Sequence, residues 1–100
     1  MATNVLALGL EDTQLDRLRG MGYYVETCFV DPGATAESMT KLHLDSRTFD
    51  CVLFGVGLRA PPQLMLLEKL LNLVHARAPL AKICFNTTPT DSAEAVQRWV

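Results

Sequence analysis

Glycines and an arginine that could bind an anion occur together in the segment 55–59. Gly55 and Gly57 would let backbone amides approach an anion, and Arg59 would supply a positive charge close by. A P-loop is excluded because no Lys-Ser or Lys-Thr pair follows, and Ala60 stands where a dinucleotide-binding motif places its third glycine. The segment therefore has two interpretations, an anion-binding loop or a tight turn between a strand and a helix.

Hydrogen-bonding side chains form a second candidate segment, which consists of Asn86, Thr87 and Thr88. Their amide and hydroxyl groups could bind a phosphate or a carboxylate. Thr88 also suits the N-cap of a helix, because Pro89 follows at a favoured position and Asp91 completes a capping-box pattern. The segment is therefore either part of an anion site or a helix cap.

Two acidic residues, Glu11 and Asp12, could act as acid and base or bind a metal ion. Alternatively, they favour a helix N-terminus through the helix dipole. His43 and His75 lie toward the opposite ends of predicted helices, and the chain shows no spacing typical of a catalytic triad or a metal centre. The sequence therefore predicts no catalytic residue, no metal site and no cofactor.

The three cysteines, Cys28, Cys51 and Cys84, each lie inside an apolar run and form no CxxC pair. Cysteines in such runs behave as small buried apolar side chains, so we expect all three to be free and buried. Free thiols indicate a reducing compartment, and no signal-peptide pattern occurs at the N-terminus. These features predict a cytoplasmic protein.

The composition favours one small globular domain. The chain has 100 residues, of which 49% are hydrophobic and 20% charged, as suits a packed core rather than disorder. Its net charge of −2 provides no basic surface for nucleic acid. Its apolar runs are shorter than the roughly 20 residues of a membrane span. We therefore expect neither nucleic acids nor membranes as partners.

Strand-like and helix-like segments alternate four times along the chain. The strand-like runs are rich in apolar, aromatic and β-branched residues and cover 5–10, 23–30, 50–54 and 82–86. Helix-like stretches follow around 15–18, from a cap at Thr35 to about 46, over about 61–78, and over 89–100. This alternation predicts βαβ crossovers and a parallel sheet.

The polarity of the runs predicts their order in the sheet. The first and third runs are continuously apolar, as central parallel strands are, whereas the second carries Glu26 and the fourth carries Lys82 and Asn86. The order 2-1-3-4 places the polar runs at the edges and gives a flavodoxin-like, doubly wound α/β sandwich of three layers. Ligands of such sheets bind beyond the carboxyl ends of the strands, where the segments 55–59 and 86–88 would lie.

A self-association surface is predicted beside the fourth strand. Leu66 and Leu73 fall outside the core sector of the third helix, so they are either scattered surface leucines or part of a subunit contact. Ile83 belongs to the expected edge strand, and Trp99 belongs to the last helix. Together, Leu66, Leu73, Ile83 and Trp99 predict a homodimer with a two-fold interface.

The first 59 residues resemble the receiver domains of two-component response regulators. Residues 19–27 (RGMGYYVET) look like the receiver segment that joins helix one to strand two, and residues 49–54 (FDCVLF) look like the third receiver strand. The resemblance implies a receiver-like fold and a regulatory role. The family's phosphoacceptor aspartate would fall at Gly55, and its acidic pair at Gly9 and Leu10, while Thr87 matches its strand-four Thr or Ser. The fifth receiver strand has no counterpart.

Three functions remain open. The first is a non-catalytic regulatory or protein-interaction module that forms homodimers or binds another protein. The second is a domain that binds a small anion or a nucleotide through its strand-end loops. The third is a small enzyme or phosphocarrier with unrecognised motifs, since the four βα units also resemble the IIB phosphocarriers of sugar phosphotransferase systems. Those carriers have a phosphorylated cysteine after strand one, where this chain has Gly9. The lack of recognisable catalytic groups and the surplus of apolar surface favour the first function.

Overall fold

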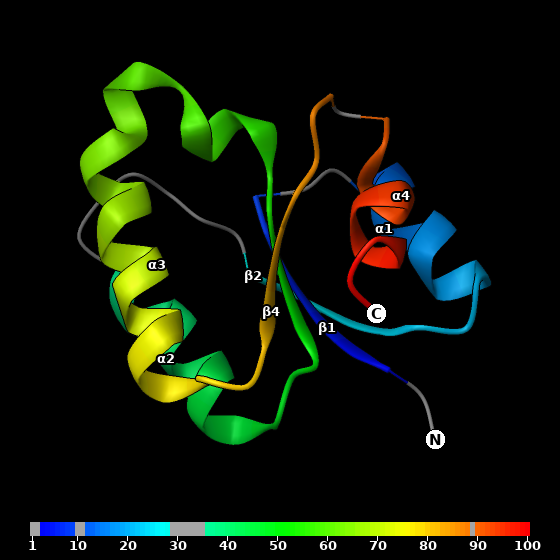
Figure 1. Cartoon of the computed structure of the whole chain (residues 1–100), viewed down its shortest axis with the longest axis horizontal. Helices are drawn as coiled ribbons and strands as arrows, with labels where there is room; N and C mark the ends of the chain where they lie inside the picture. The colour runs from blue at the N-terminus through cyan, green and yellow to red at the C-terminus, as the bar shows by residue number, and fades with distance from the viewer. Residues whose placement is uncertain (1–2, 10–11, 29–35, 89) are drawn as a thin grey trace.

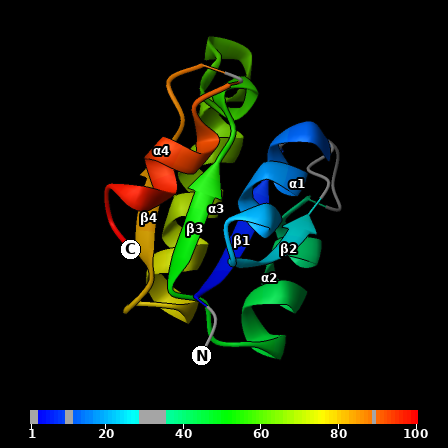
Figure 2. The same ribbon diagram turned by 90° about the vertical axis from the view of Figure 1, so that its right-hand side faces the viewer.

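The computed structural model describes residues 3–9, 12–28, 36–88 and 90–100. Its sheet contains four strands, β1 (Asn4–Leu8), β2 (Tyr24–Cys28), β3 (Cys51–Phe54) and β4 (Lys82–Phe85). All neighbouring strands are parallel, and their order is β2-β1-β3-β4. Figure 2 shows β2 and β4 at the two edges of the sheet. The predicted fold class and strand order are therefore confirmed.

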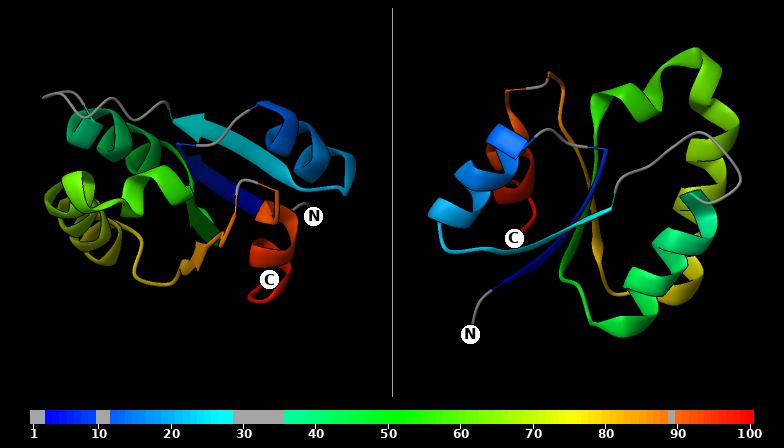
Figure 3. Two further views of the ribbon diagram at one scale, coloured as in Figure 1. Left: turned by 90° about the horizontal axis from the view of Figure 1, so that it is seen from above. Right: turned by 180° about the vertical axis from the view of Figure 1, so that it is seen from behind.

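Helices cover both faces of the sheet. The α-helices are α1 (Asp12–Gly20), α2 (Ala36–Ser46), α3 (Leu64–Arg77) and α4 (Ser92–Gln97). Two short 3₁₀ helices, η1 (Val56–Arg59) and η2 (Pro61–Gln63), connect β3 to α3. Helices α2 and α3 pack on one face, and α1 and α4 pack on the other (Figures 1 and 3). No helix among the described residues is long and apolar enough to cross a membrane.

The two central strands carry the core. Residues 5–8 of β1 and 51–54 of β3 are fully buried, as expected for parallel strands covered on both faces. Leu6 and Phe54 belong to the buried cluster under α2 and α3, whereas Ala7 and Leu53 belong to the cluster under α1 and α4. The edge strands β2 and β4 are partly exposed. The alternation follows from successive strand residues pointing to opposite faces.

Two predicted helix boundaries are wrong. The proline pair at 61–62 forms η2 rather than the first turn of the third α-helix, which begins at Leu64. The last helix begins at Ser92 and ends at Gln97, instead of extending from Pro89 to Val100. Its late start has a local cause, because the Asp91 carboxylate accepts hydrogen bonds from the backbone N–H groups of Thr87 and Thr88. The predicted cap at Thr35 and the predicted first residue of the last helix, Pro89, lie outside the described residues.

The cysteines are buried as predicted, but two of them are not free. Cys51 and Cys84 form a disulfide between β3 and β4, with their Cα atoms 6.8 Å apart, while Cys28 is a buried free thiol. In the strand register Cys84 lies beside Leu53, two residues beyond Cys51, so both cysteines point to the same face of the sheet. The expectation of a cytoplasmic compartment was based partly on three free thiols, and the disulfide removes that part of its support.

Candidate functional site

The carboxyl ends of β1 and β3 approach each other closely at Gly9 and Gly55. The backbone N–H of Gly55 donates to the carbonyl oxygen of Leu8 at 2.9 Å. A Cβ atom on Gly55 would overlap the carbonyl oxygen of Gly9, whereas a Cβ atom on Gly57 would meet nothing within 4 Å. Close backbone packing therefore accounts for Gly55, and Gly57 is not needed for packing.

Arg59 is directed inward, onto the ends of β3 and β4. Its Nη1 donates to the carbonyl oxygen of Phe54 at 2.9 Å and to Oδ1 of Asn86 at 3.3 Å. Its Nη2 donates to the backbone carbonyl of Asn86, and its guanidinium lies 5.0 Å from the centre of the Phe85 ring. The structure thus brings together two predicted site residues, Arg59 and Asn86. They form hydrogen bonds with each other, whereas the sequence predicted that they would bind an anion.

Asn86 continues this polar network into the core. The residue is 1% exposed, and its Nδ2 donates to the Oγ of Ser92 at 3.2 Å. Ser92 is fully buried in the first turn of α4. Buried polar side chains require such partners, because leaving them unpaired costs roughly 1–3 kcal/mol. The network from Arg59 to Ser92 therefore joins the segment after β3, the end of β4 and the start of α4.

Thr87 and Thr88 already hold an anionic group, which belongs to the chain itself. Asp91 Oδ1 accepts the backbone N–H of Thr87 at 2.8 Å and that of Thr88 at 3.0 Å. The Thr87 hydroxyl donates to the same carboxylate, at Oδ2. The hydrogen bonds from Thr87 and Thr88 hold the pKa of Asp91 below its usual range. The predicted anion site at Asn86, Thr87 and Thr88 stays a prediction, and an external anion bound by Thr87 and Thr88 would have to displace Asp91.

The structure does not show a site formed by the predicted acidic pair, Glu11 and Asp12. Glu11 lies outside the described residues, and for Asp12 the structure describes the backbone, which begins α1. Within the described ranges, no group of three His, Cys, Asp or Glu side chains could hold a metal ion.

A charged cluster missed by sequence reasoning lies where β2 meets the end of α2. Glu26 Oε1 lies 2.6 Å from His43 Nδ1, and Glu26 Oε2 accepts Arg47 Nε and the Tyr24 hydroxyl at 3.1 Å each. Burial alone would raise the pKa of Glu26, but the hydrogen bonds from His43, Tyr24 and Arg47 hold it below its usual range. The Arg47 guanidinium also lies 4.3 Å from the centre of the Tyr24 ring. These mutual contacts fasten α2 to the edge strand β2.

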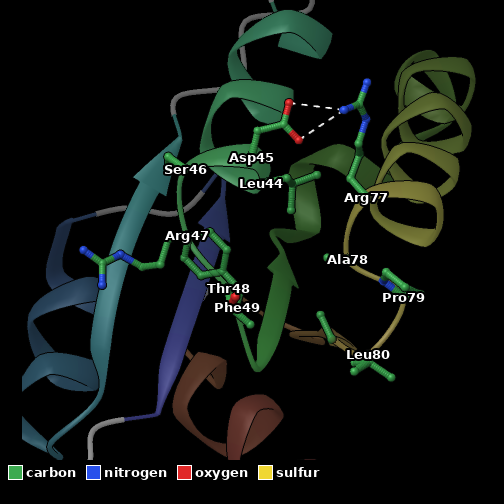
Figure 4. A pocket seen from close by; sticks show the side chains of 11 residues that line it. Leu44, Asp45, Ser46, Arg47, Thr48, Phe49, Arg77, Ala78, Pro79 and Leu80 are labelled. Carbon is green, nitrogen blue, oxygen red and sulfur yellow. Dashed lines mark hydrogen bonds and ion pairs between the residues drawn. The ribbon is translucent and has the colours of Figure 1, made fainter.

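A cavity of about 370 Å³ lies at the opposite end of the sheet from the predicted site. Its walls come from the end of α2 with residues 47–49 and from the end of α3 with residues 78–81. Figure 4 shows Arg77 and Asp45 paired at its rim and Arg47 turned away from it. Arg77 Nη1 lies 3.3 Å from the Asp45 carboxylate oxygens. Its charged groups therefore pair with other residues of the chain rather than facing the cavity.

Leu66 and Leu73 contact the apolar cluster under α2 and α3, although the helical periodicity places them outside the core sector of α3. Both side chains are partly buried. Arg77 lies four residues after Leu73 and eleven after Leu66, so all three share one stripe of α3. Arg77 contacts Asp45 of α2. The Arg77–Asp45 contact indicates that this stripe lies toward α2, while the subunit contact at Leu66 and Leu73 stays a prediction.

The β4 edge does present apolar side chains. Ile83 is 37% exposed and Phe85 is 36% exposed, and both share the sheet face covered by α3, because their strand partners are Val52 and Phe54. Trp99 is also exposed, and the neighbouring Arg98 Nη2 donates to the carbonyl oxygen of Phe85 at 2.8 Å. Of the four predicted interface residues, Ile83 and Trp99 are therefore exposed at or close to this edge.

No family model, curated protein or solved structure matches the chain.

Proposed function

We propose that this chain is a non-catalytic interaction module that associates with a second copy of itself along β4. One observation carries the proposal: the outer strand β4 exposes Ile83 and Phe85 together on one face. An edge strand with apolar side chains and outward backbone groups is a template for pairing with another strand. Lys82 is the one charged residue of β4, and a charged side chain on an edge strand disfavours non-specific pairing with other strands.

The contacts of the strand-end loops favour the interaction module over the alternative of an anion-binding domain. Arg59 donates to Phe54 and Asn86, and the amides of Thr87 and Thr88 donate to Asp91. An anion bound there would have to replace partners that are already in place, which lowers its net gain. A receiver-like regulatory role is compatible with an interaction module, and the glycine at position 55 leaves no carboxylate there to phosphorylate.

The proposal is tested by measuring mass in solution. Light scattering on the wild-type chain should rise toward twice the monomer mass as the protein concentration increases into the high micromolar range. Ile83→Glu should remain monomeric throughout, because it places a charge in the centre of the paired edge. Met39→Glu is the matched control, since Met39 is 44% exposed on α2, away from β4, and this variant should associate like the wild type. A wild-type chain that stays monomeric, or an Ile83→Glu chain that still dimerises, would contradict the proposal.

A further inference from the structure

The hydrogen-bonding pattern of β4 indicates how two copies would pair, given the proposed self-association. In a parallel sheet the N–H and C=O of one residue point to the same side, and alternate residues point to opposite sides. The N–H of Lys82 donates inward to the carbonyl oxygen of Asp50 at 2.9 Å. Ile83 and Phe85 must therefore direct their backbone groups outward, and so must the carbonyl of Ala81, which precedes Lys82.

Two backbone groups along this outer row already have partners. The carbonyl oxygen of Phe85 accepts the hydrogen bond from Arg98 Nη2 at 2.8 Å. The N–H of Ala81 donates to the carbonyl oxygen of Ala78 at 3.0 Å. The outward groups that remain are the N–H and C=O of Ile83, the N–H of Phe85 and the C=O of Ala81.

We infer that two copies pair antiparallel through β4, with the two-fold axis passing between their Ile83 residues. In this register the two Ile83 residues exchange both of their backbone hydrogen bonds. Phe85 lies opposite Ala81 of the second copy and donates its N–H to the free Ala81 carbonyl. The Phe85 carbonyl and the Ala81 N–H also face each other in this register, but they form no hydrogen bond between the copies. Each already has a partner within its own chain, Arg98 for the Phe85 carbonyl and Ala78 for the Ala81 N–H.

The neighbouring registers fit less well. A centre at Cys84 would place Ile83 opposite Phe85, and in both copies the Phe85 carbonyl would have to accept the Ile83 N–H of the second copy as well as Arg98. A centre at Lys82 would require the Ala81 N–H to leave Ala78, and it would set the two Lys82 side chains directly opposite each other. The Ile83 register breaks no hydrogen bond, and it places Lys82 opposite Cys84 and the two Ile83 side chains side by side.

The register is tested by disulfide trapping in a Cys28→Ser background, which removes the free thiol. Directly opposite residues of a hydrogen-bonded antiparallel pair have Cα atoms about 5.5 Å apart, within the range of a disulfide. Ile83→Cys should therefore form a covalent dimer under oxidised glutathione. Phe85→Cys should not, because the two Phe85 positions lie four residues out of register, roughly 14 Å apart along the strand. The double variant with Phe85→Cys and Ala81→Cys should restore the covalent dimer.

The outcomes separate this inference from the proposed function. Trapping of Ile83→Cys and of the double variant, without trapping of Phe85→Cys or of the Cys28→Ser parent, supports the register. If light scattering shows a wild-type dimer but neither Ile83→Cys nor the double variant is trapped, the register is wrong and self-association stands. A wild-type chain that is monomeric at every concentration overturns both.

Discussion

Arg59 and Asn86 lie 27 residues apart in the sequence and are joined by two hydrogen bonds at the carboxyl ends of β3 and β4. The same guanidinium donates to the carbonyl oxygen of Phe54, the last residue of β3. Both strand ends are thus held by one planar, charged group with several donors. This relationship changes the expected role of Arg59 from recruiting an anion to stabilising the fold.

Replacing Arg59 should destabilise the protein even when no ligand is present. Arg59→Ala leaves the carbonyl of Phe54 and the buried side chain of Asn86 with fewer partners, at a cost of about 1.5–3 kcal/mol in the free energy of unfolding. Urea denaturation measures this loss. Arg59→Lys keeps the charge without the planar fork, so it should recover only part of the stability. An alanine variant as stable as the wild type would show that these bonds contribute nothing.

The two glycines of segment 55–59 should respond differently to alanine. Gly55→Ala forces a Cβ atom against the carbonyl oxygen of Gly9 and should cost about 1–3 kcal/mol through strain at the ends of β1 and β3. Gly57→Ala meets open space and should change stability by less than about 0.5 kcal/mol. Paired thermal and urea denaturation curves test the difference. Equal effects of the two substitutions would contradict the close approach at Gly55.

Asp91 should make stability depend on acid pH. Because the pKa of Asp91 is lowered in the folded chain, its contribution is present above the ordinary aspartate pKa of about 3.9 and is lost as pH falls through the lower, folded value. Asp91→Ala should cost about 1 kcal/mol at neutral pH. That difference from the wild type should shrink below about pH 4 in urea denaturation. Asp91→Asn keeps an acceptor oxygen without the charge, so it should lose less at neutral pH. A constant deficit of Asp91→Ala down to the lowest pH would contradict the carboxylate's role.

Thiol titration should find one reactive group per unfolded chain. Under denaturing, non-reducing conditions a thiol reagent should label Cys28 alone, because Cys51 and Cys84 are bonded to each other. In the folded chain Cys28 should react slowly, since burial raises the pKa of its thiol. Reduction opens a loop with a sequence separation of 33 and should lower the free energy of unfolding by roughly 2–4 kcal/mol. Labelling of three thiols before reduction would exclude the disulfide.

The fold was predictable because its signals are local. Apolar runs separated by helix-like stretches mark the strands, and the charges of Glu26 and Lys82 distinguish edge strands from central ones. Those signals suffice for the order β2-β1-β3-β4. Helix ends were less predictable, since Thr88 fits a capping pattern while the Asp91 carboxylate actually turns back onto the amides before it.

The candidate site was only partly predictable, because its contacts join distant segments. Sequence reasoning selected Arg59 and Asn86 correctly as residues of the strand-end loops, but a loop position does not reveal which partner a guanidinium finds. Cys51 and Cys84 could be placed in apolar strands, yet their pairing depends on a register that brings them close in space. Likewise, the helical wheel defines one core sector of α3 but not the second helix, α2, that covers its flank.

Leu73 should stabilise the fold through packing on the flank of α3. Leu66 and Leu73 share a stripe with Arg77, which contacts Asp45 of α2, and both leucines pack against the buried cluster. Truncating a fully buried leucine costs about 2–5 kcal/mol, so Leu73→Ala, at a partly buried position, should cost about 1–2 kcal/mol. It should leave any self-association unchanged. Met65→Ala is the matched control from the same helix, since Met65 is 68% exposed and its loss should be nearly neutral.

Charged substitutions at the two leucines should unfold the protein rather than release a folded monomer. The double variant with Leu66→Glu and Leu73→Glu would place two carboxylates at partly buried positions packed against the apolar cluster, where removing water from a charge is costly. Circular dichroism should then show loss of helix and of the cooperative thermal transition. The single edge variant Ile83→Glu should keep both, because Ile83 projects from the outer strand and is 37% exposed. A double variant that is folded, melts like the wild type and is monomeric would place the leucines at the subunit contact, and it would remove α2 as their partner.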